Sequence, residues 1–130
     1  MSLGVKQKDG IVILTPNGEF YGGKESEELE RKLKELSETG NRKLLVNLGQ
    51  TTFMSSVPLN ELINCHVSYK ARDAKMKLCE LNAKVLSLLV ITKLIKEFDV
   101  YDTEEEALKS FSEEGEVGAI PKEAATPSLR

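Results

Sequence analysis

Apolar and polar residues follow two different spacings along the 130-residue chain. Positions 11–14 are apolar without interruption, and Asp9-Gly10 separates them from the run Val-Lys-Gln-Lys at 5–8. An Asp-Gly pair between two such runs favours a type I′ turn, because glycine tolerates the positive φ angles of that turn. The pattern therefore predicts an N-terminal β-hairpin, and we expect the Pro-Asn-Gly segment at 16–18 to end its second strand.

Apolar residues three and four positions apart predict an amphipathic helix over residues 24–39. Its apolar face comprises Leu29, Leu33 and Leu36. The opposite face carries acidic residues four positions before basic ones, which is typical of a solvated helix face. Gly40 supplies a left-handed C-terminal stop.

A second helix is expected to begin within Ser55-Ser56-Val57-Pro58 and to end near Arg72. A serine followed shortly by a proline is typical of a helix N-terminus, with the serine as cap and the proline in the first turn. The apolar face of this helix comprises Leu59, Leu62, Ile63, His66 and Tyr69. Their spacing predicts that the helix packs on the same sheet as the first one.

Shorter segments complete the pattern. Further strands are predicted at residues 43–48, 76–79 and 98–101. A helix that follows Asn82 as far as residue 89 is apolar over most of its circumference, so we expect it to be well buried or paired. Thr103 and Glu106 form a capping box for a last helix, which we expect to end near Phe111.

The order of these elements, β-β-α-β-α-β-α-β-α, predicts an α/β domain. We expect a mostly parallel, mixed sheet of about five strands that begins with an antiparallel hairpin, with about four helices packed against it. The domain is predicted to span residues 1–111. Large apolar residues are few after that point, so residues 112–130 are expected to form a flexible tail.

Composition narrows the classes of function. The chain has 18 basic and 21 acidic residues, a net charge of −3 and no long block of either sign, so no nucleic-acid surface is predicted. Its longest apolar stretch, residues 85–91, is about a third of the length that a bilayer-spanning helix needs, and we expect no membrane span. Two cysteines and a polar N-terminus without a cleavable signal pattern predict a cytoplasmic location.

Residue patterns for catalysis and metal binding are weak. Ser56 and His66 lie roughly 15 Å apart along one predicted helix, much farther than a nucleophile and its base can be. Cys65, His66 and Cys79 lack a fourth ligand, and neighbours on a helix diverge by about 100°. The Gly-Gly-Lys segment at 22–24 lacks the spacing of a phosphate loop. We therefore expect no enzymatic activity, no cofactor and no metal ion.

Several signals converge on residues 53–59, Phe-Met-Ser-Ser-Val-Pro-Leu. A turn from strand to helix places free backbone N–H groups and the positive end of the helix beside the hydroxyls of Ser55 and Ser56. Such a position favours an added anion, so phosphorylation of either serine is one interpretation. The alternative is that one serine is simply the helix cap.

Four segments of the chain, taken in order, form a recognisable pattern of motifs. They are Gly18-Glu19-Phe20, Leu44-Leu45-Val46-Asn47-Leu48, Thr52-Phe53-Met54-Ser55-Ser56 and Phe98-Asp99-Val100-Tyr101-Asp102-Thr103-Glu104-Glu105-Glu106-Ala107-Leu108. Together with the hairpin and the amphipathic helices, they resemble the STAS family, which comprises anti-sigma factor antagonists and related domains of sulfate transporters. The resemblance covers about residues 5–111.

This resemblance implies a bacterial regulator of transcription that is itself a substrate and not a catalyst. By the same resemblance, an anti-sigma factor kinase is the expected partner, and it phosphorylates the serine that corresponds to Ser56, with Ser55 as the second candidate. The residues expected at the partner-binding surface are Tyr21, Lys24, Met54, Ser55, Val57, Pro58 and Asn60.

The turn also departs from the usual STAS pattern. Ser55 stands in place of an aspartate, Val57 in place of a second serine, Pro58 and Asn60 in place of two glycines, and Asn47 in place of a strand-end aspartate. Two other functions therefore remain open. The domain is either a scaffold that pairs with another STAS-like chain or with itself without switching, or a binding domain for a small anionic or apolar ligand near the same helix N-terminus.

Overall fold

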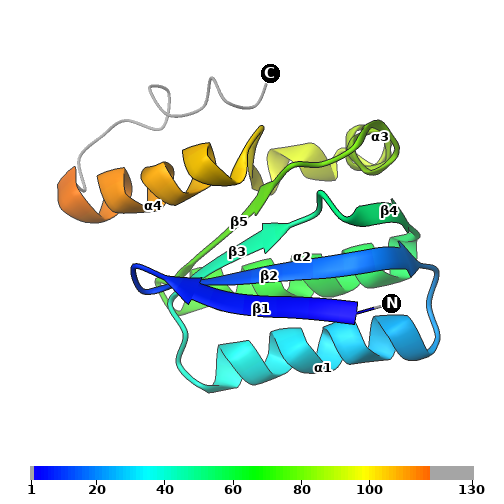
Figure 1. Cartoon of the computed structure of the whole chain (residues 1–130), viewed down its shortest axis with the longest axis horizontal. Helices are drawn as coiled ribbons and strands as arrows, with labels where there is room; N and C mark the ends of the chain where they lie inside the picture. Colours follow the sequence, from blue (N-terminus) through cyan, green and yellow to red (C-terminus); the bar gives the residue numbers. More distant parts are fainter. Residues whose placement is uncertain (1, 118–130) are drawn as a thin grey trace.

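The computed structural model describes residues 2–117 (Figure 1). The strands are β1 (Ser2–Lys8), β2 (Ile11–Phe20), β3 (Lys43–Asn47), β4 (Thr51–Met54), β5 (Lys75–Cys79) and β6 (Asp99–Tyr101). The helices are α1 (Lys24–Glu38), α2 (Ser56–Ala71), α3 (Ala83–Ile91), the short 3₁₀ helix η1 (Leu94–Lys96) and α4 (Glu104–Val117).

The described strands form one mixed sheet in the order β1-β2-β3-β5-β6, and β4 pairs with the second half of β2. Only the β1–β2 pair is antiparallel among them, and the other pairs are parallel. Helices α1 and α2 cover one face of the sheet, and α4 lies on the opposite face (Figure 1). The predicted α/β fold with a mixed sheet, an N-terminal hairpin and helices packed on it is thus confirmed.

Two apolar cores lie on the two faces of the sheet. The larger core joins alternate residues of β2, such as Val12 and Leu14, to the apolar faces of α1, α2 and α3. The smaller core joins Ile11 and Ile13 of the same strand to Phe111 of α4. Because both faces of β2 are covered, the uninterrupted apolar run at 11–14 is explained.

The N-terminal hairpin has the predicted turn. Lys8 pairs with Ile11 across a two-residue loop. Asp9 and Gly10 have φ angles of 54° and 81°, the positive pair that a type I′ turn requires.

Strand β2 is longer than predicted, because Pro16 does not end it. β2 pairs with β3 only over residues 12–14 and with β4 over residues 18–20, so Pro16 lies between its two parallel partners. On the side of β2 that faces β3 and β4, the missing N–H of Pro16 therefore removes no ladder hydrogen bond. The expectation of a strand end at residues 16–18 was therefore wrong.

Strand β4 is not among the strands that the sequence pattern predicts. Its four residues are too short to show a clear apolar alternation. Hydrogen bonds to β2 define its position: the Gly18 N–H donates to the Gln50 carbonyl at 3.0 Å, and the Thr51 hydroxyl donates to the Pro16 carbonyl at 2.9 Å. Strand β4 leads the chain directly to the serines at 55 and 56.

The four predicted helices are all present. The Asn82 side chain caps α3 by accepting the Val85 N–H at 2.9 Å, and Thr103 caps α4 by accepting the Glu106 N–H at 3.1 Å. Helix α4 continues past Phe111 to Val117, and the rest of the predicted tail lies outside the described residues. Within residues 2–117, no helix combines the length and the apolar character needed to cross a membrane.

His66 is half-buried on α2, in agreement with its place in the apolar repeat. Its ring lies 5.1 Å from the ring of Phe98, centroid to centroid. Burial lowers the pKa of the imidazole, and this effect outweighs the nearby carboxylate of Asp99, which acts in the opposite direction. The histidine is part of the packing between α2 and the segment before β6.

Lys77 is fully buried in the middle of β5, which the sequence pattern did not reveal. Its Nζ donates to the Ser110 hydroxyl of α4 at 2.8 Å and lies 4.8 Å from the centre of the Phe111 ring. The ammonium group therefore joins the sheet to α4, because a buried cation is retained where hydrogen-bond acceptors and aromatic faces satisfy it.

Candidate functional site

Ser55 lies in the single-residue connection between β4 and α2, at the N-cap position. Its N–H donates to the Phe20 carbonyl at 2.8 Å, and its hydroxyl donates to the Tyr21 carbonyl at 2.9 Å. Both groups thus join the turn to the end of β2. The hydroxyl makes no hydrogen bond to the N-terminus of α2, so the expected side-chain cap is absent.

The identity of Pro58 helps to explain the missing cap. An N-cap hydroxyl usually accepts from the second or third N–H of the helix, and Pro58, the third residue of α2, has no N–H. With one of the two usual donors gone, the Ser55 hydroxyl binds the Tyr21 carbonyl instead. The Pro58 ring itself is buried.

Ser56 is the first residue of α2 and is exposed. Among residues 2–117, no group binds its hydroxyl. The N–H groups of Ser56 and Val57 belong to the first turn of α2, where they have no partner within the helix. No acidic side chain lies in that first turn, so the positive end of the helix is not neutralised. The electrostatics of this first turn therefore favour a negative group at Ser56.

Exposed side chains with large apolar portions lie at the turn that carries Ser56. Val57 is 52% exposed and Tyr21 is 61% exposed, although both side chains are largely apolar. The Tyr21 ring packs against the ring of Phe53 at 5.0 Å between centroids, which fixes its position beside the turn. Apolar residues held at the surface in this way are typical of a contact surface for another protein.

The other predicted partner-binding residues fall into two groups. Lys24 at the start of α1 and Asn60 on α2 are exposed and free to touch a partner. Met54 is buried beneath the turn, as is Pro58. These two side chains therefore shape the turn and add little surface of their own.

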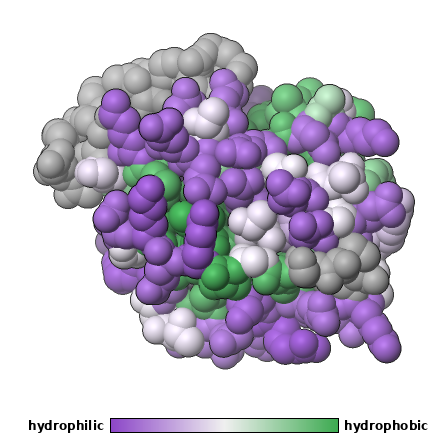
Figure 2. Space-filling view, viewed as in Figure 1, coloured by the Kyte–Doolittle hydropathy of each residue, from purple (hydrophilic) through white to green (hydrophobic). Residues whose placement is uncertain are grey.

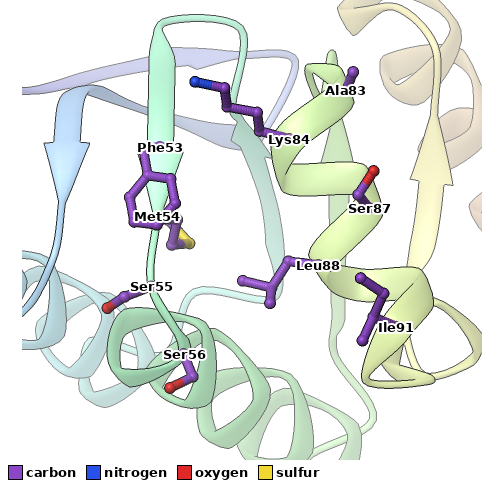
Figure 3. Close-up of a pocket in the computed structure, with 9 residues that line it drawn as sticks. All are labelled: Phe53, Met54, Ser55, Ser56, Ala83, Lys84, Ser87, Leu88 and Ile91. Atoms are coloured by element: carbon purple, nitrogen blue, oxygen red, sulfur yellow. The ribbon is translucent and has the colours of Figure 1, made fainter.

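A groove with a volume of about 620 Å³ runs between the turn and α3 (Figure 3). One wall comprises Phe53, Met54, Ser55 and Ser56, and the other comprises Ala83, Lys84, Ser87, Leu88 and Ile91 of α3. The sequence pattern does not indicate that α3 lies at this site. The available signal was the excess of apolar residues in 83–91, which are more than one buried face of a helix requires.

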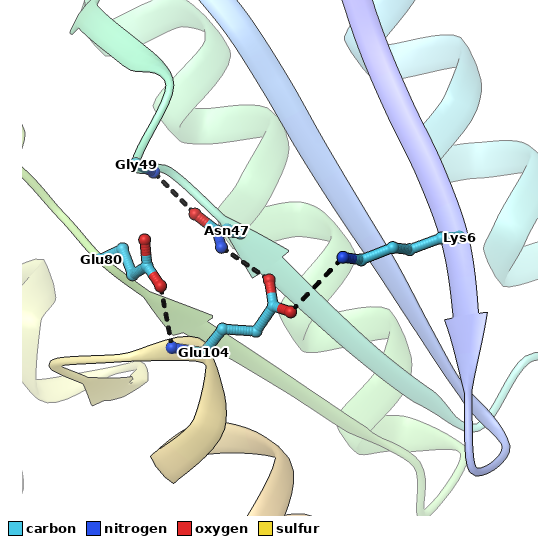
Figure 4. A network of polar contacts seen from close by, with 5 residues as sticks. All are labelled: Lys6, Asn47, Gly49, Glu80 and Glu104. Carbon is cyan, nitrogen blue, oxygen red and sulfur yellow. Dashed lines mark hydrogen bonds and ion pairs between the residues drawn. The ribbon is translucent and has the colours of Figure 1, made fainter.

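A separate cluster of polar residues joins the carboxyl ends of β3 and β5 to the start of α4 (Figure 4). The Asn47 amide donates to Glu104 Oε1 at 2.7 Å, and its carbonyl oxygen accepts the Gly49 N–H at 2.8 Å. Glu80 accepts the N–H of Glu104 at 3.0 Å, while Lys6 Nζ lies 3.6 Å from Glu104 Oε2. Every carboxylate of the cluster is thus engaged in holding α4 in place.

The cysteines do not form a reactive or metal-binding site. Both are buried and free. Burial raises the pKa of the Cys65 thiol to about 12 and also raises the pKa of the Cys79 thiol. Within the described part of the chain, no three side chains of the His, Cys, Asp or Glu type meet in a group that could hold a metal ion.

Comparison with known proteins agrees with this geometry. The family model described as the STAS domain matches residues 2–107. The chain belongs to the STAS domain family. As in the expectation from sequence, the match includes the hairpin, the turn at Ser56 and the start of the last helix.

Relatives of this STAS domain cover most of its length. BtrV of Bordetella bronchiseptica, assigned as an anti-sigma factor antagonist, is 25% identical over 111 residues, which are 85% of this chain and 95% of BtrV. The crystal structure of a protein from Thermotoga maritima, also assigned as an anti-sigma factor antagonist, matches with a TM-score of 0.77 and 26% identity. That match covers 83% of this chain and 92% of the other.

The anti-sigma factor antagonist SpoIIAA of Bacillus has the same fold at lower identity. Its unphosphorylated form matches this STAS domain with a TM-score of 0.69 and 16% identity, over 85% of this chain and 98% of SpoIIAA. SpoIIAA has also been solved in a phosphorylated form. At this identity the likeness concerns the fold alone.

Proposed function

We propose that this STAS domain is an anti-sigma factor antagonist that binds an anti-sigma factor of the serine kinase type through the Ser56 turn. Phosphorylation of Ser56 ends that binding. The observation that carries the proposal is the state of Ser56 itself. Its hydroxyl is exposed and unbound at the N-terminus of α2, and the exposed apolar side chains of Tyr21 and Val57 lie beside it.

The two serines of the turn are not equivalent as phosphate acceptors. Ser55 is half-buried, and its hydroxyl donates to the Tyr21 carbonyl at 2.9 Å. Phosphorylation of Ser55 would break this hydrogen bond. It would also place the phosphate next to the Tyr21 carbonyl oxygen, which repels it. Ser56 has neither obstacle, and the first turn of α2 favours a negative group at that position. Ser56 is therefore the residue we assign as the switch.

Phosphorylation at Ser56 changes the contact surface by charge and by hydration. A phosphate adds about −1.5 to −2 charges and three strong acceptor oxygens to a surface lined by apolar side chains. Docking of a partner onto this surface removes water from the phosphate, and the turn itself offers no basic side chain against it. The phosphorylated form is thus unable to bury the turn against the partner.

The residues that depart from the usual STAS pattern are compatible with phosphorylation of Ser56. A carboxylate at position 55 would lie beside the Tyr21 carbonyl, whereas the Ser55 hydroxyl donates to it. Serine at that position also leaves no acidic side chain next to Ser56, so the phosphate on Ser56 meets less like charge. We infer that the chain keeps the switch with a different support for the turn. Two free, buried cysteines are consistent with action in the bacterial cytoplasm.

Phosphate transfer from ATP is the experiment that tests this function. The purified chain is mixed with the serine-kinase anti-sigma factors encoded in the same genome, and the product is mapped by mass spectrometry. The Ser56 oxygen attacks the γ-phosphorus of ATP, ADP leaves, and the hydroxyl proton passes to the kinase. We expect one phosphate on the wild type and on Ser55→Ala, and none on Ser56→Ala. Equal labelling of Ser56→Ala, or no labelling by any of these kinases, would contradict the proposal.

A further inference from the structure

Helix α3 presents an apolar surface that the fold itself does not use. Val85 and Leu89 of this helix are buried in the core, and Leu88 packs against the core while remaining partly exposed. Ile91 is nevertheless 76% exposed, and Val90 is 54% exposed. The space-filling view shows hydrophobic surface over this helix (Figure 2).

Part of this surface faces the Ser56 turn. Leu88 and Ile91 line the groove from the α3 side, and Ser56 lies on the opposite wall (Figure 3). Val90, the neighbour of Ile91, does not line the groove. Phe53 on the opposite wall packs against the exposed Tyr21 ring, so the groove adjoins that ring.

Asn82 holds the two walls of the groove together. Its carbonyl oxygen caps α3, and its amide donates to the Thr51 carbonyl at 2.8 Å and to the Thr52 carbonyl at 3.3 Å. Both acceptors lie on β4, the strand that leads into the turn. The position of α3 relative to Ser56 is thus fixed by direct hydrogen bonds.

The charge of the groove differs from the charge of the chain. The chain as a whole has a net charge of −3, yet Lys84 is the charged residue of the groove lining and no carboxylate lines it. The first turns of α2 and α3, which contribute Ser56 and Ala83 to the lining, contain no acidic residue. An apolar segment with an acidic residue is the complementary occupant.

We propose that the groove receives an apolar segment of the same anti-sigma factor, with an acidic residue of that segment facing Lys84. This inference rests on the proposed function, because it assigns a second contact to the partner that binds the Ser56 turn. Leu88 and Ile91 provide the apolar wall for the bound segment. Binding therefore covers Ser56 from the α3 side as well, and α3 contributes to the choice of partner.

Binding titrations with the purified anti-sigma factor kinase test the groove. The test variant is Ile91→Asp, and the matched control is Val90→Asp, which adds the same charge to an adjacent exposed apolar position outside the groove. We expect Ile91→Asp to weaken binding about tenfold or more, and Val90→Asp to change it less than about twofold. Reversal of the charge in Lys84→Glu is expected to weaken binding as well. Circular dichroism and thermal melting confirm that each variant is folded.

The same titration separates the groove from the switch, because it includes wild type and Ser56→Asp. If wild type binds, Ser56→Asp does not, and Ile91→Asp binds like Val90→Asp, the groove inference is wrong and the proposed function stands. If Ile91→Asp and Val90→Asp weaken binding equally, the effect is one of charge on α3, and the groove inference is again wrong. If wild type does not bind the kinase, the proposed function fails and the inference fails with it.

Discussion

Replacement of Ser56 by aspartate is expected to reduce affinity for the anti-sigma factor kinase at least a hundredfold, which corresponds to about 2.7 kcal/mol of binding free energy. The introduced carboxylate loses its water when the partner covers the turn, and no basic side chain of the first turn of α2 compensates it. Ser56→Ala is expected to bind like wild type, because the hydroxyl has no hydrogen bond to lose within the described residues. The fold itself tolerates aspartate, since a negative group at a helix N-terminus is favourable.

A charge control makes the Ser56 result specific. Asn64 is exposed on α2, two turns beyond Ser56, so Asn64→Asp adds the same charge to the same helix away from the turn. Isothermal titration calorimetry is expected to give affinities for Asn64→Asp within about twofold of wild type. Equal losses for Asn64→Asp and Ser56→Asp would mean that overall charge, and not the turn, controls binding.

Replacement of Asn47 by aspartate is expected to destabilise the fold by about 2–3 kcal/mol at neutral pH. Asn47 is buried, and its amide donates to Glu104 at 2.7 Å. Aspartate removes this donor and places a third carboxylate beside Glu104 and Glu80. Lys6 is too exposed to offset the added charge. The cluster thus gives a physical reason why this chain has asparagine where the family usually has aspartate.

The pH dependence of folding stability distinguishes a lost hydrogen bond from an added charge at position 47. Three carboxylates side by side repel, so the folded variant takes up a proton more readily than its unfolded chain does. The penalty of Asn47→Asp is therefore largest at neutral pH and falls as the pH falls. Asn47→Ala loses the same bond without added charge, and its cost should depend much less on pH. Urea unfolding at pH 7.5 and 4.5 measures both, and an equal cost for the two variants at both pH values would contradict this account.

Local chemistry made the turn regions predictable from sequence. The Asp9-Gly10 turn follows from the φ angles that glycine permits. The start of α2 follows from Pro58, which suits the first turn of a helix, although the Ser55 side chain does not cap that helix. The faces of α1 and α2 follow from the helical spacing of leucines. Each of these features depends on residues that are close together in the chain.

Features that depend on distant residues were not predictable in the same way. The length of β2 depends on Pro16 lying between two parallel partners, which no local pattern shows. The location of α3 beside the Ser56 turn depends on hydrogen bonds between Asn82 and β4. Buried Lys77 is stabilised by side chains of α4 that follow it by more than thirty positions. The proposed switch residue, Ser56, could therefore be predicted from sequence, whereas the second wall of the groove required the structure.

The most direct test of the central claim is the intact mass of the chain purified from its own host, with the modified residue mapped, in growing and in stressed cells. The account predicts a phosphorylated fraction in one of these conditions, with the phosphate on Ser56 and none on Ser55. An unmodified Ser56 in both conditions would contradict the switch and would favour a STAS scaffold that binds without phosphorylation.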